Sequence, residues 1–393
     1  MSRPLRVAVD ARPLDIAFLR SQGIGRFAAE LLRELPAVAA ERGGELVLLR
    51  QGGAEGQRQP FAGPGPPDPP NDAVETRRVR RPPVPARLAD LPEQVLLPLD
   101  LRRAGADVGH SLSIYRAAVF PGVRSVMTIH DVIPLMWPRE YLRTGYVHRL
   151  LYRAARRATR LIAVSEAARR GAVEHLGVAE ARVDVVPEAA NERFRPTAAG
   201  GVPVHYGIES PYVLYVGGLE NDDPRKNVAG LIDAFARWSR ERERPETLVL
   251  SGRLAPAADG LVARARATGA RIHFTDFVAE ADLPALYSGA VCLASATRYE
   301  GFGLPALEAL ACGTPVAAFD VGALGEVAGP GAMLVPGGDL AALMRAVEAL
   351  CSDPKRRAAL AAAGREHAAG FSWRRSAELT WDVYERAAAS ART

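Results

Sequence analysis

Residues 300–308 read EGFGLPALE, and this stretch carries more information than any other in the chain. Two carboxylates, Glu300 and Glu308, are separated by seven residues. Gly301 and Gly303 lack a Cβ atom, so the backbone there can approach a ligand closely, and Pro305 suits the first turn of a helix. The stretch therefore predicts a helix whose N-terminus points unpaired N–H groups at an anion or a hydroxyl group. An ordinary helix with one capping and one surface glutamate is the alternative.

Short apolar runs alternate with amphipathic segments on both sides of this stretch. That order is typical of parallel α/β sheets, and it occurs twice along the chain. We expect strands at residues 5–9, 45–49, 125–129, 161–164 and 182–186, and again at 212–216, 247–250, 271–274, 291–294 and 315–318. We expect helices at residues 26–35, 146–157, 166–175, 227–240, 261–267, 283–288, 303–312 and 373–388, with Ser165 as an N-cap.

The hydrophobic periodicity is lost over residues 188–210, which contain two prolines and several glycines. We place the linker between two domains there, because such composition is typical of domain boundaries. The expected limits are residues 1–195 for the first domain and 205–372 for the second, followed by a helical segment at 373–393. Residues 52–72 are rich in Gly, Pro and Gln and predict a mobile loop.

The net charge of +5 is unevenly distributed, with +8 in residues 1–200 and −3 in the remainder. Two arginine groups stand out: Arg77, Arg78, Arg80 and Arg81, and then Arg149, Arg153, Arg156, Arg157 and Arg160. They indicate either attraction to an anionic lipid or acceptor, or a solvated arginine-rich surface. A nucleic-acid partner is not expected, because no aromatic residues are interleaved with them.

Other features limit the class of protein. No run of 18 apolar residues occurs and the N-terminus lacks an apolar signal core, so we expect a cytoplasmic protein that could touch a membrane only peripherally. The three cysteines are far apart, which argues against a disulfide framework and a cysteine zinc site. The chain contains no D-x-D motif, whose two aspartates could hold a divalent metal ion, so we expect no metal.

Polar residues follow two of the expected strands. Arg225 and Lys226 come after the strand at 212–216 and Gly218, where they could meet a diphosphate; the alternative is a pair of solvated cations. His130 follows the strand at 125–129 and precedes Asp131. A lone histidine is more often structural, but its place at the carboxyl end of a strand favours a site.

Together these motifs resemble those of the family 4 retaining glycosyltransferases. The resemblance runs along nearly the whole chain, and the order and spacing of its motifs are more specific than any one of them. It implies the GT-B fold: two Rossmann-like, doubly wound parallel-sheet domains facing a cleft, with the last helix crossing back to the first domain. The matching motifs are E-x7-E at 300–308, D-A-R at 10–12 with G-I-G-R at 23–26, H-D at 130–131, S-E at 165–166, R-K-N at 225–227, Tyr287, and F-S-W at 371–373.

The resemblance also implies a role for each matching residue. His130 would lie beside the transferred sugar, Glu300 would hold its 3- and 4-hydroxyls, and Glu308 would clamp a ribose. The implied catalytic residues are His130, Arg225, Lys226 and Glu300. The implied donor-binding residues are Gly23, Gly25, Gly218, Arg225, Lys226, Glu300, Gly301, Phe302, Gly303, Leu304 and Glu308.

The implied reaction is transfer of a hexose from a nucleotide sugar with retention, by a front-side mechanism without a protein nucleophile, a metal or another cofactor. Mannose from GDP-mannose is favoured, with a glucose-type sugar from a UDP donor as the other choice. The acceptor would be a glycan, a lipid-linked or a small-molecule hydroxyl. Residues 187–191 read PEAAN where the family pattern is P-N-G-V-D. The alternatives are a nucleotide-sugar epimerase or hydrolase, for which no further acid or base carboxylate stands out, and a non-catalytic nucleotide-sugar-binding protein.

Overall fold

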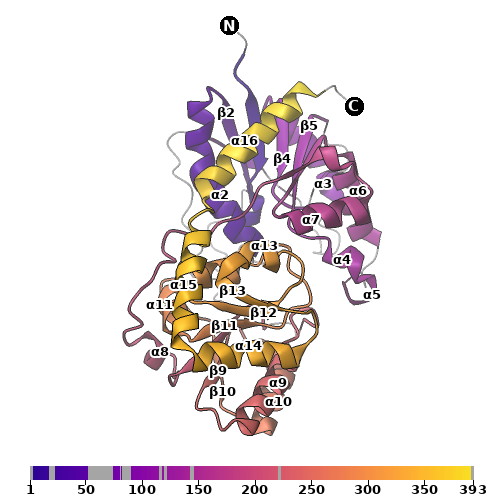
Figure 1. Ribbon diagram of the computed structural model, residues 1–393. Helices are drawn as coiled ribbons and strands as arrows, with labels where there is room; N and C mark the ends of the chain where they lie inside the picture. Colours follow the sequence, from indigo (N-terminus) through magenta and orange to yellow (C-terminus); the bar gives the residue numbers. More distant parts are fainter. Residues whose placement is uncertain are drawn as a thin grey trace. The chain divides into compact units, whose positions relative to one another are not determined.

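The computed structural model describes residues 3–16, 23–51, 74–79, 81, 90–114, 117–118, 122–141, 146–219 and 223–390. The loop expected at 52–72, Arg80 and the side chain of Arg149 lie outside the described residues. The chain divides into two compact units (Figure 1). The first contains Met1–Glu188 together with Trp373–Thr393, and the second contains Ala189–Ser372. Residues 189–195, expected in the first domain, and the expected linker apart from Glu188 thus group with the second unit.

The first unit is built on a seven-stranded parallel sheet of order β3-β2-β1-β4-β5-β6-β7. Strand β1 (Arg6–Asp10) contains the fully buried apolar run Val7–Val9, as expected for a strand covered on both faces. The strands are β1 (Arg6–Asp10), β2 (Glu45–Gln51), β3 (Glu75–Val79), β4 (Val108–Ser111), β5 (Arg124–Ile129), β6 (Arg160–Ala163) and β7 (Val183–Val185). The helices are α2 (Gly23–Glu41), α3 (Asp90–Arg103), α4 (Ile133–Met136), α5 (Pro138–Tyr141), α6 (Tyr146–Arg157), α7 (Glu166–Gly171) and α16 (Trp373–Ala389).

The second unit contains a six-stranded parallel sheet of order β10-β9-β8-β11-β12-β13. Its core lies between the sheet and amphipathic helices such as α9, with Phe235 and Phe319 among the fully buried side chains. The strands are β8 (Tyr212–Val216), β9 (Thr247–Ser251), β10 (Ile272–Asp276), β11 (Cys292–Ser295), β12 (Val316–Phe319) and β13 (Ala332–Val335). The helices are α8 (Val202–His205), α9 (Val228–Glu241), α10 (Asp259–Thr268), α11 (Leu283–Gly289), α12 (Leu304–Ala311), α13 (Leu324–Ala328), α14 (Leu340–Ser352) and α15 (Pro354–Ala368).

The C-terminal helix α16 completes the first unit and lies along α2 (Figure 1). Trp381 is fully buried, and a Cβ atom on Gly44 would come within 2.2 Å of its ring. Tyr384 bonds the Nδ1 atom of the buried His110 on β4 at 2.6 Å. The helix is therefore part of the core of the first unit, although 184 residues of the second unit precede it.

Several boundaries differ from the sequence expectation. Helix α2 begins at Gly23, so Gly23 and Gly25 lie in its first turn and not in a turn before it. The segment expected as one helix at 166–175 is α7 followed by a π-helical turn, Ala172–Leu176. Ser165 is its N-cap, since the side chain accepts a bond from the Ala168 N–H at 2.9 Å, which confirms the capping prediction.

The first arginine group is partly internal. Arg81 has only 7% of its side chain exposed and pairs with Glu93 and Asp100. Glu93 also pairs with Arg12, whose side chain is 1% exposed. Of the second group, Arg153 and Arg156 are exposed on α6.

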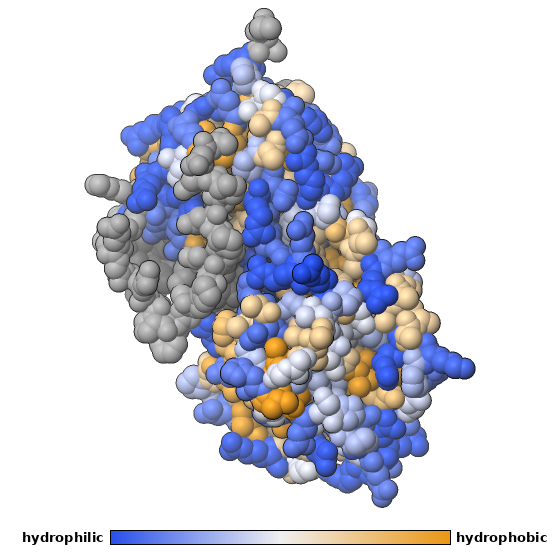
Figure 2. Space-filling model, turned by 90° about the vertical axis from the view of Figure 1, so that its left-hand side faces the viewer, coloured by the Kyte–Doolittle hydropathy of each residue, from blue (hydrophilic) through white to orange (hydrophobic). Residues whose placement is uncertain are grey.

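On the face drawn in Figure 2, hydrophilic side chains cover most of the coloured surface, and hydrophobic ones form small separate patches. Among the described residues, no helix combines the length and the apolar character needed to cross a membrane.

Candidate active site

The strand order of the second sheet reverses between β8 and β11, which are neighbours although β9 and β10 intervene in sequence. Ligands of doubly wound sheets bind at such a switch point, outside the carboxyl ends of the strands. The loops that follow these two strands carry Arg225 and Lys226 after β8, and Glu300 after β11. Topology therefore brings together residues that are about 75 positions apart.

The structure joins these three residues directly. Lys226 Nζ donates to Glu300 Oε1 at 2.7 Å, and Arg225 Nη1 donates to Glu300 Oε2 at 3.1 Å. Arg225 Nη2 also pairs with Asp223 at 3.1 Å. The four side chains form one charge cluster with two cations and two carboxylates, and each is only 14–22% exposed.

Backbone bonds fix the loop of the cations to the loop of the carboxylate. The Arg298 N–H donates to the Arg225 carbonyl at 2.7 Å, and the Arg225 guanidinium donates to the Tyr299 carbonyl at 2.9 Å. The buried Thr297 hydroxyl bonds the Tyr299 carbonyl at 3.1 Å and the Arg225 carbonyl at 3.3 Å. These bonds make the two loops one preorganised element.

Opposing effects act on the pKa of Glu300. Burial disfavours the charged carboxylate and would raise the pKa, but the charges of Lys226 and Arg225 and the hydrogen bonds of Lys226 and Thr297 outweigh burial and lower it. Glu300 is therefore an anion at neutral pH and serves as an acceptor of hydrogen bonds.

The turn between Glu300 and α12 is built on glycines. Gly303 has φ of +99°, and a Cβ atom there would come within 2.8 Å of Leu324 Cδ2, so a larger residue would be strained and Leu324 would have to move. The N–H groups of Phe302 and Gly303 have no acceptor among the described residues. Leu304 is the first residue of α12, and Gly301 is buried beside Glu300.

Gly322 is a supporting residue that sequence reasoning missed. It has φ of +57°, and a Cβ atom there would come within 2.3 Å of the Glu300 carbonyl oxygen. The Ala323 N–H donates to the same oxygen at 3.0 Å. The only signal in the sequence is a glycine just after a strand, which many turns share.

Glu308 is much less accessible than Glu300, with 1% of the residue exposed. It accepts a bond from the Tyr287 hydroxyl at 2.9 Å. In this structure the carboxylate is therefore engaged by protein, and a ribose would have to share it with Tyr287.

Gly218, an implied donor-binding residue, has open space around the position of a Cβ atom in the structure. Gly218 is exposed, whereas a Cβ atom on the neighbouring Gly217 would come within 2.6 Å of the Tyr215 hydroxyl oxygen.

His130 lies in the first unit, as do Gly23 and Gly25. It follows β5, and its Nε2 atom donates to the carbonyl of Leu112, which follows the neighbouring strand β4, at 3.0 Å. Its Nδ1 atom lies 3.2 Å from Glu188 Oε1. The strand order of the first sheet reverses between β1 and β4, so His130 lies one strand from that switch point.

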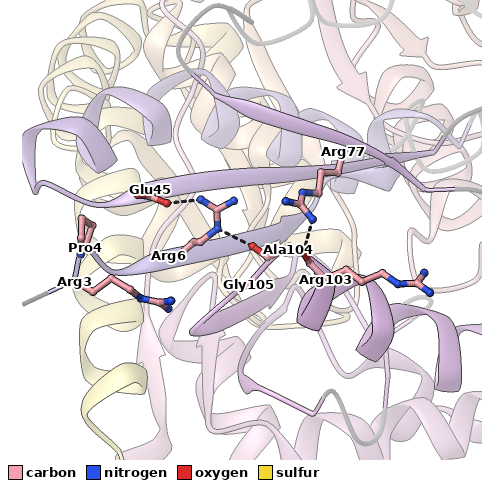
Figure 3. A pocket seen from close by; sticks show the side chains of 8 residues that line it. All are labelled: Arg3, Pro4, Arg6, Glu45, Arg77, Arg103, Ala104 and Gly105. Carbon is pink, nitrogen blue, oxygen red and sulfur yellow. Dashed lines mark hydrogen bonds and ion pairs between the residues drawn. The ribbon is translucent and has the colours of Figure 1, made fainter.

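A hollow of about 360 Å³ lies elsewhere, at the amino-terminal ends of β1 and β2 (Figure 3). Two of its arginines are bonded to other lining residues: Arg6 donates to Glu45 and to the Ala104 carbonyl, and Arg77 donates to the Arg103 carbonyl. It is at the opposite end of the sheet from His130 and holds none of the candidate site residues. It is lined by Arg3, Pro4, Arg6, Glu45, Arg77, Arg103, Ala104 and Gly105.

Two Rossmann-like parallel-sheet units define the α/β GT-B class of glycosyltransferases, and solved structures confirm this fold. Sucrose-phosphate synthase from Thermosynechococcus elongatus is similar with a TM-score of 0.74 and 21% identity, over 97% of this chain and 98% of that chain. Anabaena Alr3699/HepE in complex with UDP and glucose is similar with a TM-score of 0.69 and 18% identity, over 99% of this chain and 100% of that chain.

Family models match both units. A model of glycosyltransferase family 4 matches residues 21–193, and one of glycosyl transferases group 1 matches residues 207–367. The chain belongs to the family 4 glycosyltransferases, as the motifs predict, and it is a glycosyltransferase.

Curated relatives agree. O-antigen chain mannosyltransferase B of Escherichia coli is 30% identical over 67% of this chain and 70% of that protein. The serotype-specific mannosyltransferase WbdA of the same organism is 28% identical over 67% of this chain, but the match spans only 33% of its length. D-inositol 3-phosphate glycosyltransferase of Kineococcus radiotolerans is 34% identical over 58% of each chain.

Proposed function

We propose that this protein is a retaining hexosyltransferase that moves mannose from GDP-mannose to a glycan hydroxyl without a metal. The observation that carries the proposal is the charge cluster at the switch point of the second sheet. It brings two cations, Arg225 and Lys226, within hydrogen-bond distance of one carboxylate, Glu300. A sugar diphosphate needs these two kinds of group side by side.

The chemistry follows from where charge develops. The bond between the sugar and the diphosphate breaks, and the departing phosphate oxygen gains negative charge. Preorganised cations and N–H donors that meet this charge supply a large part of catalysis in such reactions. Arg225, Lys226 and the N–H groups of Phe302 and Gly303 provide such donors at one edge of the sheet.

In the proposed reaction the acceptor hydroxyl attacks from the face that the diphosphate leaves, and its proton passes to the departing phosphate oxygen. The new bond therefore has the old configuration, and no protein nucleophile is needed. Glu300 would hold the 3- and 4-hydroxyls of the donor sugar, Glu308 the ribose, and His130 would act beside the transferred sugar.

The names of the relatives support the choice of mannose and of a glycan acceptor, because the first of them is an O-antigen chain mannosyltransferase. The match to D-inositol 3-phosphate glycosyltransferases supports a phosphorylated small-molecule acceptor as the second candidate. All three of these curated relatives are named as transferases of sugars, which does not favour an epimerase, a hydrolase or a non-catalytic binding protein.

Donor turnover tests the proposal. The full chain is mixed with GDP-mannose, UDP-glucose or UDP-N-acetylglucosamine, with and without a mannan oligosaccharide or inositol 3-phosphate, and released nucleoside diphosphate is measured. We expect GDP release that depends on the oligosaccharide and is unchanged by EDTA, and an α-linked product from the α-linked donor. Activity that EDTA abolishes and magnesium restores would refute metal independence, and an inverted product would refute retention.

The exposed Arg153 and Arg156 on α6 support a peripheral contact of the first unit with an anionic membrane at the cytoplasmic face. Cosedimentation with vesicles tests this contact. Equal recovery with neutral and anionic vesicles at low salt would refute it.

A further inference from the structure

Both ring nitrogens of His130 face hydrogen-bond acceptors. Nε2 lies 3.0 Å from the Leu112 carbonyl oxygen, and Nδ1 lies 3.2 Å from Glu188 Oε1. A neutral imidazole carries one N–H, whereas an imidazolium carries two. With a carbonyl and a carboxylate as partners, the arrangement is satisfied when both nitrogens carry a proton.

Aromatic packing restricts rotation of the His130 ring. The ring of Phe27, on α2, meets it edge to face with centroids 4.7 Å apart, and Phe27 in turn meets Trp373 at 5.8 Å. The side chains of His130 and Glu188 are only 15% and 6% exposed. Rotation away from Glu188 would disturb this packing, so the pair is fixed.

The surrounding charges favour the cation. Burial by itself lowers the pKa of His130, but the hydrogen bond and charge of Glu188, the Leu112 carbonyl and the charge of Asp131 together raise it. His110, on β4, opposes this effect only weakly, because burial lowers its own pKa to about 3 and leaves it neutral. Phe27 and Trp373 bring no charge.

Glu188 also has a special place in the chain. It is the last residue of the first unit before the chain enters the second, and Trp373 is the first residue after the chain returns. The carbonyl of the preceding residue, Pro187, accepts a bond from Ser376 on α16 at 2.6 Å. The two chain segments that connect the units, after Glu188 and before Trp373, are therefore both anchored in the first unit.

We propose that Glu188 is a positioning residue that keeps His130 doubly protonated and its ring fixed, so that a cation stands at the carboxyl end of β5 during sugar transfer. The proposal rests on the proposed function, in which His130 acts beside the transferred sugar. A fixed cation there would stabilise negative charge that develops near His130 during the transfer. Glu188 stands at a position where the family pattern P-N-G-V-D has asparagine, which carries no charge.

Three variants test the proposal: Glu188→Gln, which removes the charge at equal size; Glu188→Asp, which keeps it; and Glu192→Gln, a matched control at an exposed glutamate. For each, kcat and KM are measured from pH 5 to 9, and His130 is titrated by NMR in the full chain. In Glu188→Gln we expect the pKa of His130 to fall by at least one pH unit. The decrease of kcat at high pH, here called the alkaline limb, should begin at least one pH unit lower. At pH 8, kcat should be reduced tenfold or more, while KM stays nearly unchanged. We expect Glu188→Asp to restore most of the limb and Glu192→Gln to match the wild type.

An alkaline limb and a His130 titration that are the same in wild type and Glu188→Gln would overturn the proposal. An equal loss in the Gln and Asp variants would also overturn it, because it would show a packing role. Failure of the proposed function is distinguishable, since transfer that is undiminished in His130→Ala would exclude a role for His130 in the reaction, while the NMR titration still reports on the pair.

Discussion

Replacing Glu300 by glutamine tests the charge cluster most directly, because it removes one negative charge at nearly constant size. The carboxylate compensates two cations, Lys226 at 2.7 Å and Arg225 at 3.1 Å, while Asp223 compensates only Arg225. Two unit charges about 4 Å apart interact by roughly 4 kcal/mol at an effective dielectric constant near 20. Breaking a fully buried pair costs about 3–5 kcal/mol. These groups are partly exposed and Asp223 remains, so we expect a loss of about 1–3 kcal/mol in the free energy of unfolding.

The same change has opposite effects on two ligands. A nucleoside diphosphate without a sugar should bind Glu300→Gln equally well or up to about tenfold more tightly, a gain of up to 1.4 kcal/mol, because Lys226 and Arg225 no longer have to leave a carboxylate. Sugar transfer should fall at least about 100-fold in kcat/KM, because hydrogen bonds from hydroxyls to a charged acceptor contribute about 1.5–3 kcal/mol each.

Calorimetry with GDP and UDP, a transfer assay and urea unfolding of the full chain measure these three quantities. Glu366→Gln, an exposed glutamate of the second unit, is the control and should match the wild type in all three. If Glu300→Gln bound both nucleotides more weakly, and by as much as Lys226→Met, the carboxylate would not compete with phosphate for the cations, and the reasoning would be refuted.

Three further predictions follow from single residues. Lys226→Met should lower kcat/KM about 10²–10³-fold, as loss of one preorganised electrostatic donor does, and a loss below threefold would contradict its role. Gly303→Ala should destabilise the second unit by about 1–3 kcal/mol, because φ is +99° and Leu324 blocks the Cβ atom; an unchanged urea midpoint would contradict this. His110 is neutral when folded, since burial lowers its pKa to about 3, but takes up a proton below about pH 6.5 when unfolded. Stability should therefore fall as pH drops from 6.5 towards 3, by about 1.4 kcal/mol per pH unit from this group, and His110→Gln should remove that part of the slope in urea unfolding at pH 7 and 5.

The sequence predicted the elements with strong local patterns. Strand β8 and helix α6 begin and end at the expected residues, because apolar runs and 3.6-residue periodicity mark them clearly. Strands β3 and β4 were not predicted from the sequence, for two different reasons. β3 reads ETRRV and buries only Val79, so it lacks alternation, while β4 reads VGHS and is recognisable as a buried strand only in its tertiary context.

Within the candidate site, the same division holds. The family resemblance implied that Arg225, Lys226 and Glu300 bind one donor, and in the structure each follows a strand of the second sheet, β8 or β11. The pairing of His130 with Glu188 could not be predicted, because it depends on the order of β5, β6 and β7 in the sheet. Local patterns locate strand ends but give no information on which side chains meet when they are 58 positions apart in the sequence.

The position of α16 has a consequence for how the protein is made. The second unit leaves the ribosome as one uninterrupted segment and can fold as soon as it emerges, whereas the first waits for its last helix, even though its sheet is synthesised earlier. Until α16 arrives, the groove that receives Trp381 stays open to water and to chaperones. A nascent chain released at Ser372 would therefore carry a finished second unit attached to an incomplete first one, which makes the completion of the first unit the late and vulnerable step of biogenesis.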